Sequence, residues 1–194
     1  MKLKCHNLTI YNIAKGECSN YWWHEGEADL EASVFATILI KHLIRKCTEN
    51  LPIIIYSDGC GYQNRKCVMS NALLRYSIAK NVVIEQKLLI KGHTQMECDS
   101  AHSLIERKLK NKDIYLPSDY IRITTEARVK PYPFEAFLLT HSYFYDFKNL
   151  KPTLQLDLEL VKVSLRSKIS VLYSMIHLLL VLVISCCSMN HTVL

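Results

Sequence analysis

The chain has 194 residues, of which 49% are hydrophobic and 22% charged, and its formal net charge is +6. This composition excludes an intrinsically disordered protein and fits one globular domain of ordinary size with an additional segment. The positive charge is spread thinly, so it permits nucleic-acid binding without demonstrating it. The eight cysteines include no Cys-x-x-Cys pair, and the first residues lack the apolar core of a secretory signal. Both features predict free thiols in a reducing compartment.

The first quarter of the chain predicts a β-hairpin followed by a helix. Residues 6–12 alternate in polarity as a strand does, and Gly16 marks a turn before the aromatic-rich residues 18–25. From residue 30 to residue 47, apolar side chains recur at helical spacing. A hairpin and a long amphipathic helix are therefore expected here.

Strands and helices then alternate. The β-branched run at residues 52–57 predicts a buried central strand, and residues 82–90 predict a second apolar strand. Residues 64–80 and 96–110 each place apolar side chains on one helical face. Strands that alternate with helices in this way predict a parallel pairing within a three-layer α/β fold.

Three further elements are predicted after residue 110. Residues 117–128 read as a short helix, residues 132–140 as a strand, and residues 154–165 as a candidate strand. The expected organisation is an α/β domain over residues 1–150 and a connector over residues 151–168.

The C-terminal segment differs from the rest because residues 169–189 contain no charged side chain. About 20 apolar residues are enough to span a bilayer, and Arg166 and Lys168 precede the segment on the expected cytosolic side. A single transmembrane helix, acting as a C-terminal anchor in a membrane, is predicted. The alternatives are a buried core helix, or residues appended by an error of the gene model, with the protein in the nucleus or cytoplasm.

Two acidic residues follow predicted strands. Asp58 comes directly after the β-branched run and before Gly59 and Gly61, which turn the chain. Asp99 follows the next predicted strand and lies close to His93. Ligands of open α/β sheets bind at the carboxyl ends of the strands, so these residues predict a divalent-metal site. Asp58 as a turn residue and Asp99 as a helix N-cap are the alternatives.

Several other features have a structural and a functional interpretation. The histidines His93 and His102 are either metal ligands or satisfied hydrogen-bonding groups. The basic run at residues 107–112 is either a solvated helix face or a phosphate-binding segment. Trp22 and Trp23 either pack in the core or stack on bases. A zinc site has no common spacing here, and its candidate ligands would be Cys60, Cys67, His93 and Cys98.

These residues resemble the signature of a family of transposon-derived animal proteins whose central domain has no assigned function. The matching positions cover roughly residues 5–150, and they are Trp23-His24-Glu25, Ser57-Asp58-Gly59-Cys60, Gln63-Asn64, Gly92-His93-Thr94, Asp99, His102, Ile105-Glu106 and Pro131-Tyr132-Pro133. The resemblance implies the ribonuclease H-like fold of DDE transposases and integrases, with a mixed sheet.

The resemblance also implies a mechanism. In that fold, three acidic side chains hold two Mg²⁺ or Mn²⁺ ions about 4 Å apart for phosphoryl transfer on DNA. Asp58 matches the second acid and Asp99 the third, with Glu106 as the competitor for the third position. His93 is an additional candidate metal ligand. If active, the chain would be a Mg²⁺-dependent phosphoryl transferase or nuclease.

The first acid of this set is missing. The two strands before the first helix correspond to the second and third of the expected meander, so the first strand would lie before Met1. Glu25, Glu27 and Asp29 follow both strands and cannot replace it. The prediction is therefore a truncated, catalytically inactive nucleic-acid-processing domain that lacks its first strand. The alternative is a domesticated binding or scaffold protein, tethered to a membrane by its C-terminal helix.

Overall fold

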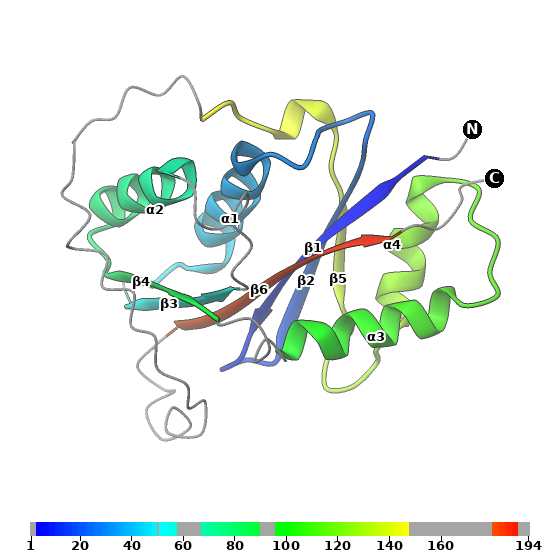
Figure 1. Cartoon of the computed structure of the whole chain (residues 1–194). Helices are drawn as coiled ribbons and strands as arrows, with labels where there is room; N and C mark the ends of the chain where they lie inside the picture. The colour runs from blue at the N-terminus through cyan, green and yellow to red at the C-terminus, as the bar shows by residue number, and fades with distance from the viewer. Residues whose placement is uncertain (1–2, 50, 58–66, 90–95, 148–179, 190–194) are drawn as a thin grey trace. The chain divides into compact units, whose positions relative to one another are not determined.

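The computed structural model describes residues 3–49, 51–57, 67–89, 96–147 and 180–189 (Figure 1). Within these residues, four α-helices accompany one mixed sheet of six strands in the order β4-β3-β6-β1-β2-β5. The fold is therefore of the α/β class. The chain forms two compact units, of which the first contains Met1–Asp29, Gln95–Tyr143 and Val183–Leu194. The second contains Leu30–Thr94 and Phe144–Leu182.

The first unit is built on an antiparallel hairpin. Strand β1 (Cys5–Asn12) pairs with β2 (Glu17–His24) over its full length, from Cys5 opposite His24 to Asn12 opposite Glu17. Gly16 closes the turn with a φ of 65°, a conformation that glycine adopts without steric cost. Strand β5 (Glu135–Leu138) then adds to β2 in parallel, and a short 3₁₀ turn, η1 (His141–Tyr143), follows it.

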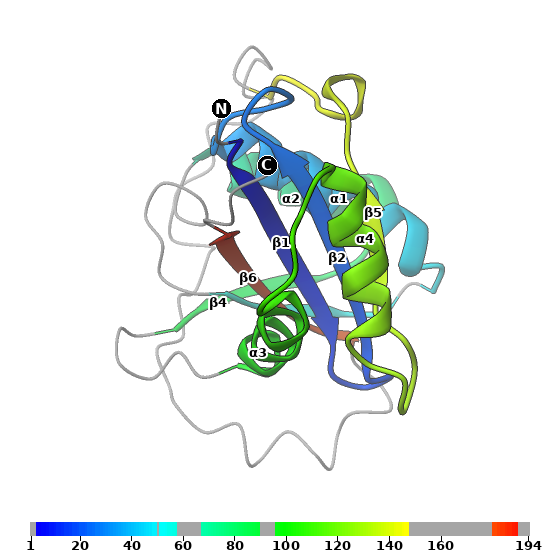
Figure 2. The ribbon, with the colours of Figure 1, turned by 90° about the vertical axis from the view of Figure 1, so that its right-hand side faces the viewer.

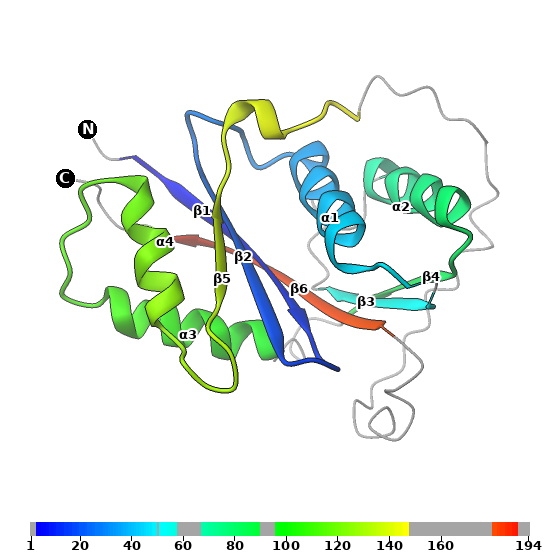
Figure 3. The same ribbon diagram turned by 180° about the vertical axis from the view of Figure 1, so that it is seen from behind.

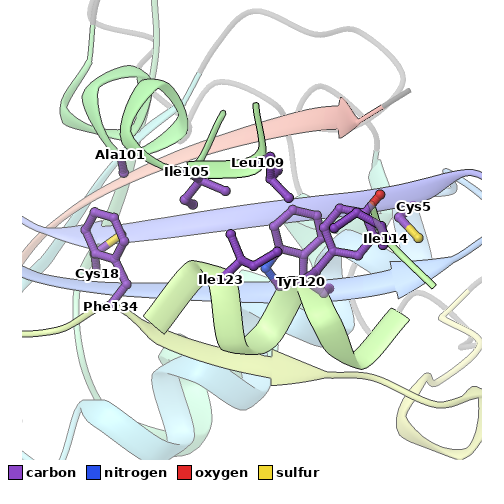
Figure 4. Close-up of a cluster of buried hydrophobic side chains, with 10 residues drawn as sticks. Cys5, Cys18, Ala101, Ile105, Leu109, Ile114, Tyr120, Ile123 and Phe134 are labelled. Atoms are coloured by element: carbon purple, nitrogen blue, oxygen red, sulfur yellow. The ribbon is translucent and has the colours of Figure 1, made fainter. Parts of the chain in front are cut away.

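Helices α3 (Glu97–Leu109) and α4 (Pro117–Glu126) cover one face of this hairpin (Figure 2). Side chains from the two helices, both strands and the connecting segments form one apolar cluster, and Trp22 stacks on Tyr120 at 4.7 Å between ring centroids. Figure 4 shows the cluster, whose members are Cys5, Cys18, Trp22, Ala101, Ile105, Leu109, Ile114, Tyr120, Ile123 and Phe134. This burial of apolar surface is the main term that holds the first unit together.

The Arg128 side chain forms hydrogen bonds to both the hairpin turn and the segment after α4. Its Nη2 donates to the carbonyl oxygen of Gly16 at 2.9 Å, and its Nε donates to that of Tyr132 at 2.8 Å. The guanidinium carbon lies 4.3 Å from the ring centroid of Phe134. One side chain thus uses hydrogen bonds and a cation–π contact to join two loops.

The second unit contains α1 (Ala32–Lys46), β3 (Ile53–Ser57), α2 (Cys67–Lys80) and β4 (Ile84–Leu88). Strands β3 and β4 are parallel, with Ile53 opposite Ile84, and α1 packs beside α2. The extended segment after η1 lies along α1, where the backbone N–H of Tyr145 donates to Oγ1 of Thr37 at 3.1 Å.

The sequence predicted the order and type of these elements through β5, with ends displaced by up to three residues. Strand β4 differs in character, because all five of its residues are partly exposed instead of forming a buried apolar strand. Its terminal position in the strand order explains this exposure, since an edge strand has a neighbour on one side only. The candidate strand at residues 154–165 lies outside the described residues.

The prediction of one continuous helix over residues 169–189 is wrong for its second half. Leu180–Met189 forms strand β6, which lies between β3 and β1 in the strand order. The backbone N–H of Leu180 donates to the carbonyl oxygen of Pro52 at 3.0 Å. Figures 1 and 3 show β6 running opposite to β1. Val181 to Ile184 are all buried. An uncharged run with β-branched residues is compatible with a central strand as well as with a membrane helix. Here the neighbouring strands of the sheet supply its backbone hydrogen-bond partners.

Residues 169–179 of the predicted helix lie outside the described residues. Within the part of the chain that the structure describes, no helix is both long and apolar enough to cross a membrane. Localisation to a membrane stays a prediction.

The burial of β6 gives a stability test. Leu182 is 0% exposed, and we expect Leu182→Ala to lower the free energy of unfolding by about 2–5 kcal/mol because it leaves a cavity. Leu138→Ala, in the edge strand β5 and 41% exposed, should cost less than about 1 kcal/mol. Urea unfolding of the full chain measures both values. Equal, small effects of the two substitutions would show that β6 is not part of the core.

Candidate functional site

The strand that precedes Asp58 has the predicted form, whereas Asp58 and His93 themselves lie outside the described residues. Strand β3 ends at Ser57, which is 1% exposed, and pairs in parallel with β4 as expected. The backbone N–H of Leu89 continues this pairing by donating to the carbonyl oxygen of Ser57 at 2.9 Å. The predicted proximity of Asp58 to Asp99 stays a prediction.

Asp99 caps the helix that carries it. One oxygen of its carboxylate accepts the backbone N–H of Met96 at 2.8 Å, and its own N–H donates to the carbonyl oxygen of Met96 at 2.9 Å. Met96 is therefore the N-cap residue, and Asp99 at the third helical position caps its N–H as the acid of a capping box does. The alternative of Asp99 as the N-cap residue is therefore wrong, because Met96 has that position and Asp99 caps from the third residue of the helix.

Helix α4 repeats this arrangement. The carboxylate of Asp119 accepts the backbone N–H groups of Tyr115 and Leu116 at 3.1 and 3.0 Å. These two hydrogen bonds, with a smaller contribution from the Arg122 guanidinium, lower the pKa of Asp119 below its usual value. An aspartate in the first turn thus starts both helices of the first unit, because it pairs with N–H groups that have no helical partner.

Glu106 lies on the exposed surface of α3. It is seven residues from Asp99, so the two carboxylates share one side of the helix but are about 10 Å apart along its axis. That separation is too large for both to ligate one ion. Asp99 and Glu106 are therefore alternatives for a metal ligand and not a pair.

His102 points into the first unit and joins a buried polar cluster. Its Nε2 lies 2.8 Å from Oγ1 of Thr9, which in turn donates to Oδ1 of Asn20 at 2.8 Å. Asn7 donates to the same oxygen at 3.2 Å. The Thr9 hydroxyl donates its single proton to Asn20, so toward His102 it can only accept a hydrogen bond. His102 must therefore carry a proton on Nε2 to donate it.

Sequence reasoning missed the strand members of this cluster. Thr9 and Asn20 are opposite each other in the ladder, and Asn7, Thr9 and Asn20 are each 0% exposed. The available signal was the polar side chains that alternate with the other face along both hairpin strands. The alternation within one strand does not show whether such a polar face is buried or exposed. Thr9 and Asn20 are tolerated in the core because hydrogen bonds offset their loss of water. Asn7 is paired through Nδ2, whereas its Oδ1 has no partner among the described residues.

Burial also controls the titratable groups of this region. The pKa of His102 is lowered mainly by burial, and the charge of Asp99 opposes this shift. Burial raises the pKa of the Cys5 thiol to about 11 and that of Cys18 to about 12. The Cys98 thiol donates to the carbonyl oxygens of Val183 at 3.3 Å and Thr9 at 3.6 Å, and burial raises its pKa as well. These three are unreactive core thiols.

The other candidate residues from the sequence are two tryptophans and the possible zinc ligands. Trp22 and Trp23 are each 1% exposed, so neither presents a ring face to a base. Among the described residues, no three His, Cys, Asp or Glu side chains come together as a metal-binding group. Of the candidate zinc ligands, Cys98 is buried and Cys67 is exposed, whereas Cys60 and His93 lie outside the described residues. Binding of Mg²⁺ or Mn²⁺ by Asp58, Asp99 or Glu106 stays a prediction.

Comparison of the chain with protein-family models, with curated proteins and with solved structures finds no match.

The capping role of Asp99 predicts the effect of its removal. We expect Asp99→Ala to lower the free energy of unfolding by about 1 kcal/mol in the presence of a chelator, because the Met96 N–H loses its acceptor. Glu97→Ala removes an acid from the same helical turn and should cost less. If Asp99→Ala changes only the stabilisation by added Mg²⁺, the side chain is a metal ligand and not a cap.

The lowered pKa of His102 predicts a pH dependence of stability. Its folded-state pKa lies below the unfolded value of about 6.5, so the unfolded chain binds the proton more readily. Stability should therefore fall as the pH drops below about 6.5, by at most about 1.4 kcal/mol per pH unit for one group. His6, whose pKa burial also lowers, adds to this slope. We expect His102→Gln to reduce the slope of unfolding free energy against pH. His141→Gln, at an exposed position, is the control for the substitution itself.

Proposed function

We propose that this chain is a degenerate ribonuclease H-like domain of the transposase and integrase type, which binds nucleic acid without cutting it. The observation that carries the proposal is the order of its elements. An antiparallel hairpin leads into a helix, then into two parallel strands joined by a helix, and the first of these strands ends directly before Asp58. Asp58 thereby follows a strand end of the kind at which ligands bind in α/β sheets.

The position of β6 supports the loss of catalysis. In the proposed fold the strand between those that correspond to β3 and β1 carries the first acid, and in this chain β6 has that position in the strand order. Its sequence, Leu180 to Met189, contains no acidic residue. A two-ion site with this strand would therefore lack one of its bridging carboxylates.

The environment of the third acid also supports this proposal. The carboxylate of Asp99 is engaged by the Met96 N–H, and Glu106 is two helical turns away from it. A carboxylate that accepts a backbone hydrogen bond has fewer lone pairs free for a metal ion. We therefore expect only weak binding of one Mg²⁺ or Mn²⁺ ion, at Asp58.

A second candidate function is that of a non-catalytic binding or scaffold protein that has kept the acids as structural residues. The capping role of the Asp99 carboxylate favours it, because that role needs no metal. The two candidates differ in whether the full chain binds nucleic acid.

Incubation of the full chain with supercoiled DNA and Mg²⁺ or Mn²⁺ tests the proposal. We expect binding at low salt, measured by gel shift, and no nicking above the level of Asp58→Asn. Nicking that is lost in Asp58→Asn would show an active enzyme. A chain that binds no DNA at low salt would favour the scaffold function instead.

A further inference from the structure

The turn after α3 presents a group of cations to solvent. Arg107 and Lys108 end the helix, and Lys110 and Lys112 follow in the turn, all four with exposed side chains. Asn111 in this turn has a φ of 62°, in the left-handed region that asparagine adopts more readily than most residues.

The turn is held in place by buried residues on both sides. Leu109 and Ile114 are each 1% exposed and belong to the apolar cluster of the first unit. The backbone N–H of Lys112 donates to the carbonyl oxygen of Leu109 at 3.0 Å. Anchored at both ends, the turn presents its cations from a fixed backbone, which lowers the entropy lost when an anion binds.

The four cations make no ion pair with the residues that the structure describes. Arg122 on α4 provides a contrast, because its guanidinium lies 3.9 Å from Asp119 and 3.6 Å from Glu126. The negative end of the α3 dipole accounts for Arg107 and Lys108 in the last turn. Lys110 is the C-cap residue, so the dipole accounts for its charge as well, whereas Lys112 lies two residues beyond the cap.

An exposed aromatic ring lies next to these cations in the chain. Tyr115 is 61% exposed, and its backbone N–H is fixed by the Asp119 carboxylate at 3.1 Å. A tyrosine of this kind offers a flat apolar face that costs little entropy to immobilise, because its backbone is already held. Cations beside an exposed aromatic ring are the two components of a surface for single-stranded nucleic acid.

We propose that Arg107, Lys108, Lys110, Lys112 and Tyr115, together named the basic turn, bind single-stranded nucleic acid. The lysines and the arginine contact phosphates, and the Tyr115 ring stacks on a base. The choice of nucleic acid as the polyanion rests on the proposed function. The basic turn follows the C-terminal end of α3, whereas Asp99 lies in the first turn of that helix, so binding here needs no divalent metal.

The test measures the affinity of the full chain for a short, mixed-sequence single strand by fluorescence anisotropy. The measurement is repeated at several salt concentrations in the presence of a chelator. We expect the double variant Lys110→Gln, Lys112→Gln to weaken binding. It should lower the slope of log affinity against log salt by about 1.4, because each phosphate contact contributes about 0.7. Tyr115→Ala should weaken binding at least about fivefold with an unchanged salt slope, because it removes stacking but no charge.

The matched control is Lys15→Gln, Lys130→Gln. It removes two exposed cations of the same unit, one in the hairpin turn and one in the segment after α4. If this control lowers the salt slope as much as the double variant, net charge and not the basic turn governs binding. Urea unfolding of each variant confirms that it is folded.

The other outcomes separate this inference from the proposed function. Strong binding of the single strand that neither the double variant nor Tyr115→Ala weakens would overturn the basic turn and leave the proposed function standing. A full chain that binds no nucleic acid at low salt would overturn both. If the double variant loses binding to anionic phospholipid vesicles but keeps its binding to the single strand, the turn contacts lipid headgroups. That outcome would also overturn this inference.

Discussion

The register of the β1–β2 ladder is the constraint on which the first unit depends. With Thr9 opposite Asn20, one face of the hairpin presents Cys5, Cys18 and Trp22 to the helices. Side chains alternate between the two faces of a strand, so a slip of one residue would turn the apolar set away from α3 and α4. It would also separate the Thr9 hydroxyl from the Asn20 amide.

The buried polar cluster makes that register specific. An apolar face alone tolerates sliding, whereas Thr9, Asn20 and His102 are satisfied only in one alignment of two strands and one helix. A polar group that loses its partner in the core costs about 1–3 kcal/mol, so misaligned states are disfavoured. The cluster thus links the histidine singled out in the sequence to the packing of the hairpin, and not to a metal ion.

The candidate site shows where sequence reasoning succeeds and where it stops. The β-branched run before Asp58 has one favourable structure, so β3 and its parallel partner could be predicted. Asp99 had two compatible roles, since an aspartate at the start of a helix suits both capping and metal binding. The hydrogen bond from Met96 shows the capping role, and it depends on where the helix begins, which local pattern locates only within a few residues.

The sequence alone determined the α/β class, the hairpin, the four helices and the parallel strand pair, because each has a local period or turn signal. Tertiary structure decided the form of the C-terminal segment. Leu180–Met189 is uncharged and apolar, and such a run can satisfy its backbone as a helix or as a strand between two others. Its hydrogen-bonding partners come from residues far earlier in the chain, as in the bond from Leu180 to Pro52. No local pattern specifies a partner at that distance, so only the assembled sheet could make the choice.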